Sequence, residues 1–402
     1  MLQRSIIQQV IKNQRQKAER QSVGLEREIL PEIPDMQTHT LIVSGIRRCG
    51  KSTLLLQLLK NDKRRSLYLN FEDPRLFGFE LSDFRLLDNI ISELKCESLF
   101  FDEIQVISHW ELYVRQKLDE GYKVVLTGSN ASLLSRELGT KLTGRHITKE
   151  LFPFSYREFL AFKSLQSDVK SWQRYIEIGG FPEFVKTNNS DVLTALFYDI
   201  LTRDIVVRHG IRDINSLKRL AVYIISNVGN LVTAGKLQQA LGIKSTATIL
   251  NYFSFLEDTY LVNFLPKFSY SYKRQLVNPR KIYVIDPGII KIASASFTKN
   301  SGHLLENFVY WELRRRGKEL YYFNENGSEC DFVVVKNGNI EQVIQVCYEL
   351  SPENMERELR GLREAMQFFN TDCGMIITQQ QTDAYIQNNK QINIVPAYQY
   401  FK

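Results

Sequence analysis

The chain has few cysteines, and none of them is spaced for a metal site. Five cysteines occur among 402 residues, at positions 49, 96, 330, 347 and 373, with no C-x-x-C pair. This pattern argues against both zinc binding and a disulfide framework. It is typical of a protein from a reducing compartment, so we expect a cytoplasmic location.

Long apolar runs, low-complexity tracts and fixed-period repeats are also missing. No run approaches the roughly 18–20 apolar residues that span a bilayer. The segment from Gln3 to Gln21 is polar, unlike a secretory leader. We therefore expect no membrane contact. The net charge of +7 is compatible with a polyanionic partner without requiring one.

A phosphate-binding loop is the most specific motif present. Residues 45–52 read GIRRCGKS, a full G-x-x-x-x-G-K-[ST] sequence between an apolar run at 41–43 and a helical pattern at 53–59. In that order, loop N–H groups and a helix N-terminus can hold phosphates. Lys51 is expected to reach the β- and γ-phosphates, and Ser52 to ligate Mg²⁺. The predicted nucleotide-binding residues are Gly45, Arg48, Cys49, Gly50, Lys51, Ser52 and Thr53.

Two adjacent acids end a second apolar strand pattern, at 98–103. In a P-loop fold, Asp102 would hold the Mg²⁺ through water and Glu103 would polarise the attacking water. A third strand pattern leads to Ser129 and Asn130, either of which could orient that water beside the γ-phosphate. A plain strand-ending turn is the alternative. The chain has no N-K-x-D base-reading motif, which favours ATP over GTP.

Strand patterns at 41–43, 66–73, 98–103 and 123–130 alternate with helical patterns. Alternation of this kind predicts an α/β fold with a parallel, doubly wound sheet.

A helix-turn-helix pattern followed by a strand lies at 233–262. A short helix ends at Gly242, and Ser245 or Thr246 could cap a second helix with an apolar stripe. We interpret this pattern as a winged helix, in which Lys244, Ser245, Thr246 and Thr248 could contact DNA. A protein-binding or lid role is the alternative.

The segment 267–281 carries five Lys or Arg residues, no acid and interleaved aromatic residues. Phosphate pairing and base stacking would make it a nucleic-acid contact that includes Lys273 and Arg274. A solvated β-hairpin is an equally good interpretation.

The last region has the order of elements of a restriction-endonuclease-like fold, which is an α+β fold. Glu306 on a helix and Asp331 on a strand match the expected metal-binding carboxylates. Gln345 and Cys347 stand where a further carboxylate and a lysine are expected. We therefore predict a degenerate, vestigial nuclease site that lacks its cation.

Several segments together resemble a prokaryotic family of AAA+-type ATPases: GIRRCGKSTLL, LNFEDPR, LFFDEIQ, LTGSNASLL and LTGRHITKELFPFSYREFL. The resemblance covers nearly the whole chain and implies an ATPase core, a winged helix and a nuclease-like domain. It also implies that Arg145, in LTGR, could act as an arginine finger, in cis or on a neighbouring subunit. An ordinary surface arginine is the alternative.

We therefore predict three parts: an N-terminal helix and ATPase core at 1–160, a helical linker and winged helix at 161–266, and a degenerate nuclease-like domain at 267–402. The predicted function is ATP hydrolysis with Mg²⁺, coupled to binding of DNA or another partner. The alternatives are an ATP-gated DNA endonuclease and a non-catalytic ATP-binding scaffold or sensor. The oligomeric state stays open.

Overall fold

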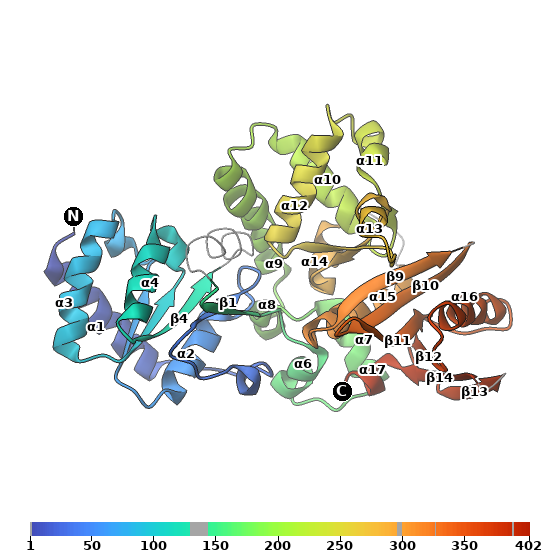
Figure 1. Cartoon of the computed structure of the whole chain (residues 1–402), viewed down its shortest axis with the longest axis horizontal. Helices are drawn as coiled ribbons and strands as arrows, with labels where there is room; N and C mark the ends of the chain where they lie inside the picture. Colours follow the sequence, from blue (N-terminus) through green and yellow to red (C-terminus); the bar gives the residue numbers. More distant parts are fainter. Residues whose placement is uncertain (1, 129–143, 296–299, 326, 388–389) are drawn as a thin grey trace. The chain divides into compact units, whose positions relative to one another are not determined.

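The computed structural model describes residues 2–128, 144–295, 300–325, 327–387 and 390–402. It divides into two compact units, Met1–Phe152 and Pro153–Lys402. Figure 1 shows the elements of both units along the chain. No helix among the described residues is long and apolar enough to cross a membrane.

The first unit is built on a five-stranded parallel sheet with the strand order β2-β3-β4-β1-β5. This confirms the predicted parallel α/β core, and β5 adds a strand that the sequence patterns did not indicate. The strands are β1 (Thr40–Ser44), β2 (Ser66–Asn70), β3 (Ser98–Asp102), β4 (Lys123–Gly128) and β5 (His146–Glu150), and the long helices are α1 (Arg4–Arg20), α2 (Lys51–Asn61), α3 (Phe84–Leu94) and α4 (Trp110–Asp119).

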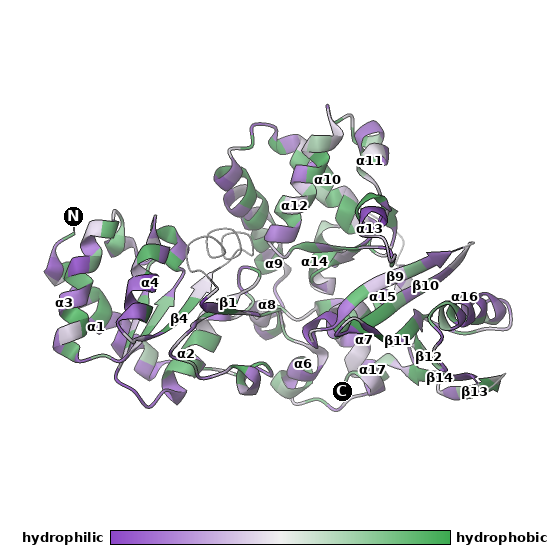
Figure 2. Ribbon diagram, viewed as in Figure 1, coloured by the Kyte–Doolittle hydropathy of each residue, from purple (hydrophilic) through white to green (hydrophobic). Residues whose placement is uncertain are grey.

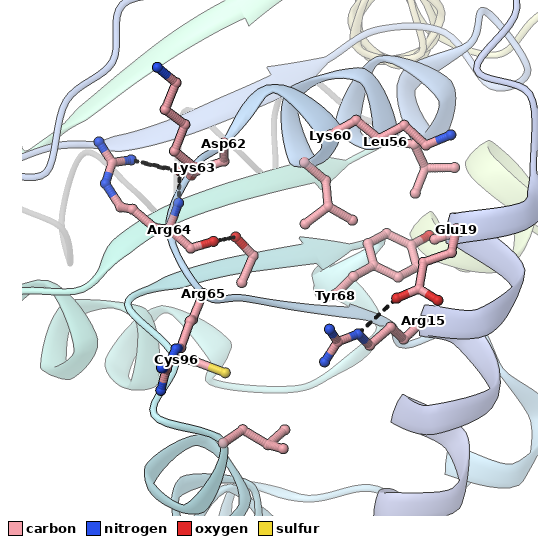
Figure 3. Close-up of a pocket in the computed structure, with 14 residues that line it drawn as sticks. Arg15, Glu19, Leu56, Lys60, Asp62, Lys63, Arg64, Arg65, Tyr68 and Cys96 are labelled. Carbon is pink, nitrogen blue, oxygen red and sulfur yellow. Dashed lines mark hydrogen bonds and ion pairs between the residues drawn. The ribbon is translucent and has the colours of Figure 1, made fainter.

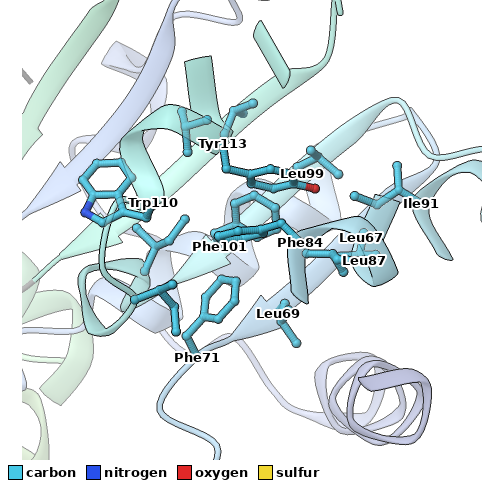
Figure 4. Close-up of a cluster of buried hydrophobic side chains, with 14 of the residues drawn as sticks. Leu67, Leu69, Phe71, Phe84, Leu87, Ile91, Leu99, Phe101, Trp110 and Tyr113 are labelled. Carbon is cyan, nitrogen blue, oxygen red and sulfur yellow. The ribbon is translucent and has the colours of Figure 1, made fainter. Parts of the chain in front are cut away.

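Buried apolar strands explain why this sheet lies inside the unit. β1 and β3 are buried along their whole length, as expected for strands covered on both faces. Figure 4 shows part of a large apolar cluster, in which Phe84 of α3 stacks on Tyr113 of α4 with ring centroids 3.9 Å apart. Figure 2 shows hydrophobic and hydrophilic residues on both α1 and α3, as expected for helices that cover a sheet.

The second unit begins with helices that a double-glycine turn divides. Gly179 and Gly180 separate α7 (Val169–Ile178) from α8 (Pro182–Thr187). A Cβ on Gly179 would lie 2.0 Å from Asp286 Oδ1, and one on Gly180 would lie 2.2 Å from the Phe154 carbonyl. The turn is therefore a structural feature. The other helices of this part are α6 (Tyr156–Lys163), α9 (Ser190–Asp199), a π-helical segment (Ile200–Val207) and α10 (Ile214–Ser226).

Two helices and a small antiparallel sheet follow. α11 (Ala234–Leu241) ends at Gly242, whose φ is 64°. α12 (Thr246–Asp258) is capped by Ser245, whose hydroxyl accepts from the Thr248 N–H at 3.1 Å. The sheet has the order β6-β8-β7, with β6 (Leu231–Val232), β7 (Val262–Leu265) and β8 (Arg280–Val284). The predicted helices are present, whereas the winged-helix assignment stays a prediction.

Between β7 and β8 the chain forms a short helix, α13 (Tyr272–Val277). The two strands pair antiparallel, so this segment is the helical connection of a hairpin rather than a hairpin in itself. β7 and β8 also pair across the predicted boundary at residues 266 and 267. The three-part division stays a prediction.

The C-terminal part contains a mixed six-stranded sheet with the order β13-β14-β12-β11-β10-β9. α16 (Met355–Phe368) contacts β10, and α15 (Ser301–Arg315) contacts β8 and β11. The strands are β9 (Glu319–Glu325), β10 (Ser328–Lys336), β11 (Asn339–Val346), β12 (Cys373–Thr378), β13 (Asp383–Gln387) and β14 (Lys390–Pro396), with the short helices α14 (Pro287–Ala293) and α17 (Ala397–Tyr400).

Candidate functional site

The predicted phosphate loop lies between β1 and α2, at the carboxyl end of the parallel sheet. Its first glycine is required by a close approach: Gly45 has a φ of 149°, and a Cβ there would lie 2.0 Å from the Leu151 carbonyl. Gly50, with a φ of 106°, occupies the N-cap position of α2. Both glycines therefore permit a backbone path that a larger residue would disrupt.

Two contacts hold the loop against the strand end after β5. The buried Cys49 thiol donates to the Leu151 carbonyl at 3.2 Å, and burial raises the pKa of this thiol. The buried Arg27 guanidinium donates to the Cys49 carbonyl at 2.9 Å and to the Phe152 carbonyl at 2.7 Å. Arg27 was not predicted, because it lies before the motif and only the fold brings it to the loop.

Lys51 lies at the first position of α2, with its ammonium folded onto the loop. Its Nζ donates to the carbonyls of Gly45 and Ile46, both at 3.1 Å. Lys51 itself is buried. This places a cation at the mouth of the loop, where phosphate oxygens would replace the two carbonyls as partners.

The predicted acids lie next to this loop because of the strand order. β4 separates β1 from β3, so the ends of all three strands meet at one edge of the sheet. Asp102 is fully buried, and burial raises the pKa of its carboxyl group, opposed first by a hydrogen bond from Thr127 and then by bonds from Ser52 and Tyr68. The contact between Asp102 and Ser52 brings together the two oxygen groups expected to hold Mg²⁺.

Thr127 connects the two acids and was not predicted. Its hydroxyl donates to Asp102 Oδ1 and accepts from the Glu103 N–H at 2.9 Å. The Glu103 carboxylate is half-buried and accepts from Gln105 Nε2. Ser129 and Asn130, the predicted γ-phosphate sensors, lie outside the described residues.

Two further residues hold the other carboxylate oxygen of Asp102. Tyr68 donates its hydroxyl to Asp102 Oδ2 at 3.0 Å, and Asn70 Nδ2 donates to the same oxygen at 3.1 Å. Both belong to β2, which pairs with β3 so that Asn70 lies opposite Asp102. Gln14 of α1 accepts from the Asn70 N–H at 2.8 Å, which connects the N-terminal helix to this site.

Arg145 lies at the other end of the sheet. It precedes β5, and its carbonyl accepts from the N–H of Thr40, the first residue of β1. Its guanidinium pairs with Asp119 at 2.6 Å. This geometry does not bring Arg145 to the phosphate loop of its own chain. A role on a neighbouring subunit stays a prediction.

The predicted nuclease carboxylates do come together, with a lysine that the sequence analysis placed elsewhere. Lys281 Nζ lies 3.0 Å from Glu306 Oε1, 2.7 Å from Asp331 Oδ1 and 2.6 Å from Glu329 Oε1. Lys281 is only 2% exposed. The assignment of this lysine to an exposed, nucleic-acid-binding run is therefore wrong, and so is the expectation that the carboxylate cluster lacks a cation.

The charges of this cluster stabilise one another. Burial alone would lower the pKa of Lys281, but Asp331, Glu306 and Glu329 raise it well above its usual value. Burial raises the pKa of Glu306 to about 7. The Lys281 ammonium lies between the carboxylates, where a metal cation would bind. In the described part of the chain, no group of three or more His, Cys, Asp or Glu could hold a metal ion.

Gln345 and Cys347 contact different partners. Gln345 Oε1 accepts from the Asp331 N–H at 3.3 Å, and its Nε2 donates to Glu358 at 2.7 Å. Cys347 donates to the Glu349 carbonyl at 3.2 Å, and burial raises the pKa of its thiol to about 11. Gln345 therefore supports the carboxylate cluster, whereas Cys347 makes a local contact beyond β11.

The predicted DNA contacts lie on the surface of the second unit. Lys244 and Thr246 are exposed and Ser245 is half-buried at the start of α12. Lys273 and Arg274 are exposed on α13, where Tyr272 is 72% exposed.

Family models match three consecutive parts of the chain. An AAA domain matches residues 37–160, and two domains of unknown function, DUF8612 and DUF4143, match residues 169–300 and 301–400. The AAA match covers the phosphate loop and both acids.

Two uncharacterized proteins are similar over most of their length. The MJ1544 protein of Methanocaldococcus jannaschii is 35% identical over 82% of this chain and 79% of its own. A protein of Haemophilus influenzae is 32% identical over 78% of this chain and 83% of its own.

Solved structures with some likeness include Cdc6p of Pyrobaculum aerophilum and PCH-2 of C. elegans, each at 16% identity. Cdc6p covers 56% of this chain and 80% of its own length, with a TM-score of 0.26. PCH-2 covers 63% of this chain and 66% of its own length, with a TM-score of 0.24. Likeness at this level carries no argument about function. The sequence relatives show the family: the chain belongs to the same family as the MJ1544 protein, and its AAA domain places it among the P-loop ATPases.

Proposed function

We propose that this chain binds ATP and hydrolyses it with Mg²⁺ at the phosphate loop. The observation that carries the proposal is the convergence of Lys51, Ser52 and Asp102 at one edge of the sheet, with Glu103 held beside them through Thr127. A bare phosphate loop would bind a triphosphate. The adjacent acids supply the groups that hydrolysis needs.

Each residue has a defined task in this proposal. Lys51 and the N–H groups of residues 45–53 bind the β- and γ-phosphates, which places the γ-phosphate near the strand ends. Ser52 and Asp102 would hold Mg²⁺, which neutralises phosphate charge. Glu103 orients the attacking water and accepts its proton.

Nucleotide turnover tests this proposal. We expect Lys51→Ala to lose both ATP binding and turnover, because the phosphates lose their main cation. Glu103→Gln should still bind ATP but turn it over about 10²- to 10⁴-fold more slowly, the usual contribution of a general base. Turnover is measured as released phosphate, and binding with a fluorescent ATP analogue.

The two variants separate the hypotheses. Equal, negligible turnover by wild type and Glu103→Gln, with ATP still bound, would contradict hydrolysis and favour a scaffold or sensor. The remaining candidate, an ATP-gated DNA endonuclease, requires plasmid cleavage in the presence of ATP that Asp331→Ala abolishes and Glu103→Gln, which still binds ATP, does not. The position of Lys281 among the carboxylates argues for a structural role of that cluster.

We further propose that ATP state is coupled to DNA binding by the second unit. The support is the exposed Lys244 at the start of α12 and the exposed, basic and aromatic surface of α13. N-terminal residues of such a helix are suited to contact base edges. Neutralising Lys244, Lys273 and Arg274 together should weaken a gel shift of duplex DNA and reduce its salt dependence. An unchanged shift would exclude these residues as the contact.

A further inference from the structure

A basic pocket lies on the ATPase unit, away from the phosphate loop. Its volume is about 720 Å³, and it is bounded by α1, the end of α2 and the start of β2. Five cations line it against two carboxylates, Glu19 and Asp62; the cations are Arg15, Lys60, Lys63, Arg64 and Arg65. Figure 3 shows these side chains together with Tyr68, which also lines the pocket.

The carboxylates leave part of this positive charge uncompensated. Arg15 pairs with Glu19 at 3.1 Å, and Arg64 pairs with Asp35 at 2.6 Å. Lys63 and Arg65 are exposed and form no salt bridge with any residue that the structure describes. A cavity lined by more cations than carboxylates has a positive potential, which favours an anionic occupant.

One further cation of α1 lies near the pocket. Lys12 is exposed about one helical turn before Arg15, and Glu19 is the single acid of this helix. Solvated cations beside an open pocket fit a chain of phosphates better than one small anion, which a closed cage of donors would bind.

Tyr68 connects this pocket to the proposed ATPase site. Its side chain lines the basic pocket and also a second cavity, of about 530 Å³, that contains Ser52 and Asp102. Its hydroxyl donates to Asp102 Oδ2 at 3.0 Å. Any ligand that moves this ring changes a hydrogen bond of the Mg²⁺-binding carboxylate.

We propose that the basic pocket binds the phosphate backbone of a nucleic acid, and that Tyr68 transmits its occupancy to Asp102. The binding part is independent of the proposed ATPase function, whereas the coupling part rests on it.

Binding is tested on the full chain by fluorescence anisotropy of a short labelled DNA duplex, without ATP. Lys63→Glu/Arg65→Glu should weaken binding roughly tenfold at low salt and reduce the slope of log affinity against log salt by about 2. Arg85→Glu/Arg115→Glu is the matched control, since both arginines are exposed on the same unit outside the pocket. Circular dichroism and the melting temperature show whether all variants are folded.

Three results would overturn the binding proposal. They are wild-type protein that does not bind the duplex, equal losses in the pocket variant and the control, and binding of inorganic tripolyphosphate to Lys51→Ala that Lys63→Glu/Arg65→Glu abolishes and the duplex does not displace. The last would assign the pocket to a small anion.

Coupling is tested with Tyr68→Phe, which keeps the ring and removes the bond to Asp102. At a duplex concentration that saturates both proteins, we expect the ratio of ATP turnover with and without DNA to lie closer to one in this variant than in wild type. A DNA-dependent ratio equal to that of wild type contradicts the role of Tyr68. If wild type hydrolyses no ATP, the proposed function fails and the binding result is unaffected.

Discussion

At the scale of single residues, the candidate ATPase site combines motif residues with partners from distant strands. Lys51, Ser52, Asp102 and Glu103 could be predicted, because each belongs to a short pattern that is continuous in sequence. Thr127, Tyr68 and Asn70 could not, because only strand pairing brings them to Asp102. A polar residue at the end of an apolar strand was the available signal, and it led to Ser129 and Asn130 instead of Thr127.

Thr127 provides a test at this scale. Thr127→Val keeps the shape of the side chain but removes the bonds to Asp102 and to the Glu103 N–H. We expect ATP turnover to fall at least about tenfold, because a buried donor and a buried carboxylate lose a partner, at about 1–3 kcal/mol each.

The matched control for this change is Thr127→Ser, which retains the hydroxyl and should keep most of the turnover. Phosphate release at saturating Mg²⁺ and ATP measures both variants. Equal turnover by the two variants would contradict the role of the hydrogen bonds, because only Thr127→Val lacks the hydroxyl.

Lys281 shows a different failure of prediction at the same scale. It lies in a run of basic residues, which suggested an exposed surface. The signal for burial was that Lys281 begins the stretch Lys281–Val284, whose other residues are apolar or aromatic. Lys281 stands two residues before Tyr283 and therefore lies on the same face of the strand. Tyr283 also donates to Glu306, at 2.6 Å.

At the scale of elements, close backbone approach fixes how helices pack on sheets. Gly361 lies within α16, and a Cβ there would come within 2.1 Å of the Glu329 carbonyl on β10. A glycine in the middle of a helix normally costs about 1 kcal/mol relative to alanine. Its presence is explained by this contact, which lets the helix lie directly on the strand.

Gly361→Ala is therefore expected to destabilise the protein by about 2 kcal/mol or more, since the helix must move away from β10. Gly235→Ala is the control, because Gly235 lies in α11 with nothing within 4 Å of the added Cβ. That change should be neutral or stabilising by up to about 1 kcal/mol. Chemical unfolding followed by circular dichroism measures both, and similar values would contradict the packing argument.

Elements were predicted best where the pattern was local. The helices on either side of Gly242 and the strands of the ATPase core follow from apolar periodicity and end signals. α13 was missed because its six residues are too few to show a helical period, and none of its residues is buried. β5 was missed because its residues are half-buried or exposed rather than uniformly apolar.

At the scale of the whole molecule, one ion cluster connects separate elements of the second unit. Lys281 belongs to the three-stranded sheet, Glu306 to α15, and Glu329 and Asp331 to the six-stranded sheet. Their bonds join segments far apart in sequence, so the two sheets of this unit are expected to unfold together.

Lys281→Met tests this expectation. It removes the buried ammonium and leaves three carboxylates without their cation, which should cost about 3–5 kcal/mol of stability. Lys336→Met, on the exposed end of β10, should change stability by less than about 0.5 kcal/mol. Denaturant unfolding followed at two wavelengths measures the free energy of unfolding of both variants. A small loss of stability in Lys281→Met would show that the cluster contributes little to the stability of this unit.

The contact made by Arg27 has a practical consequence for anyone who shortens this protein. The AAA family model begins at residue 37, ten residues after the guanidinium that bridges Cys49 and Phe152. A fragment cut at that border would also lose α1, whose Ile7 and Val10 are fully buried in the core of the unit. Proteolysis or recombinant trimming in this region should therefore yield insoluble or nucleotide-free material, and the smallest active piece must start near the beginning of α1.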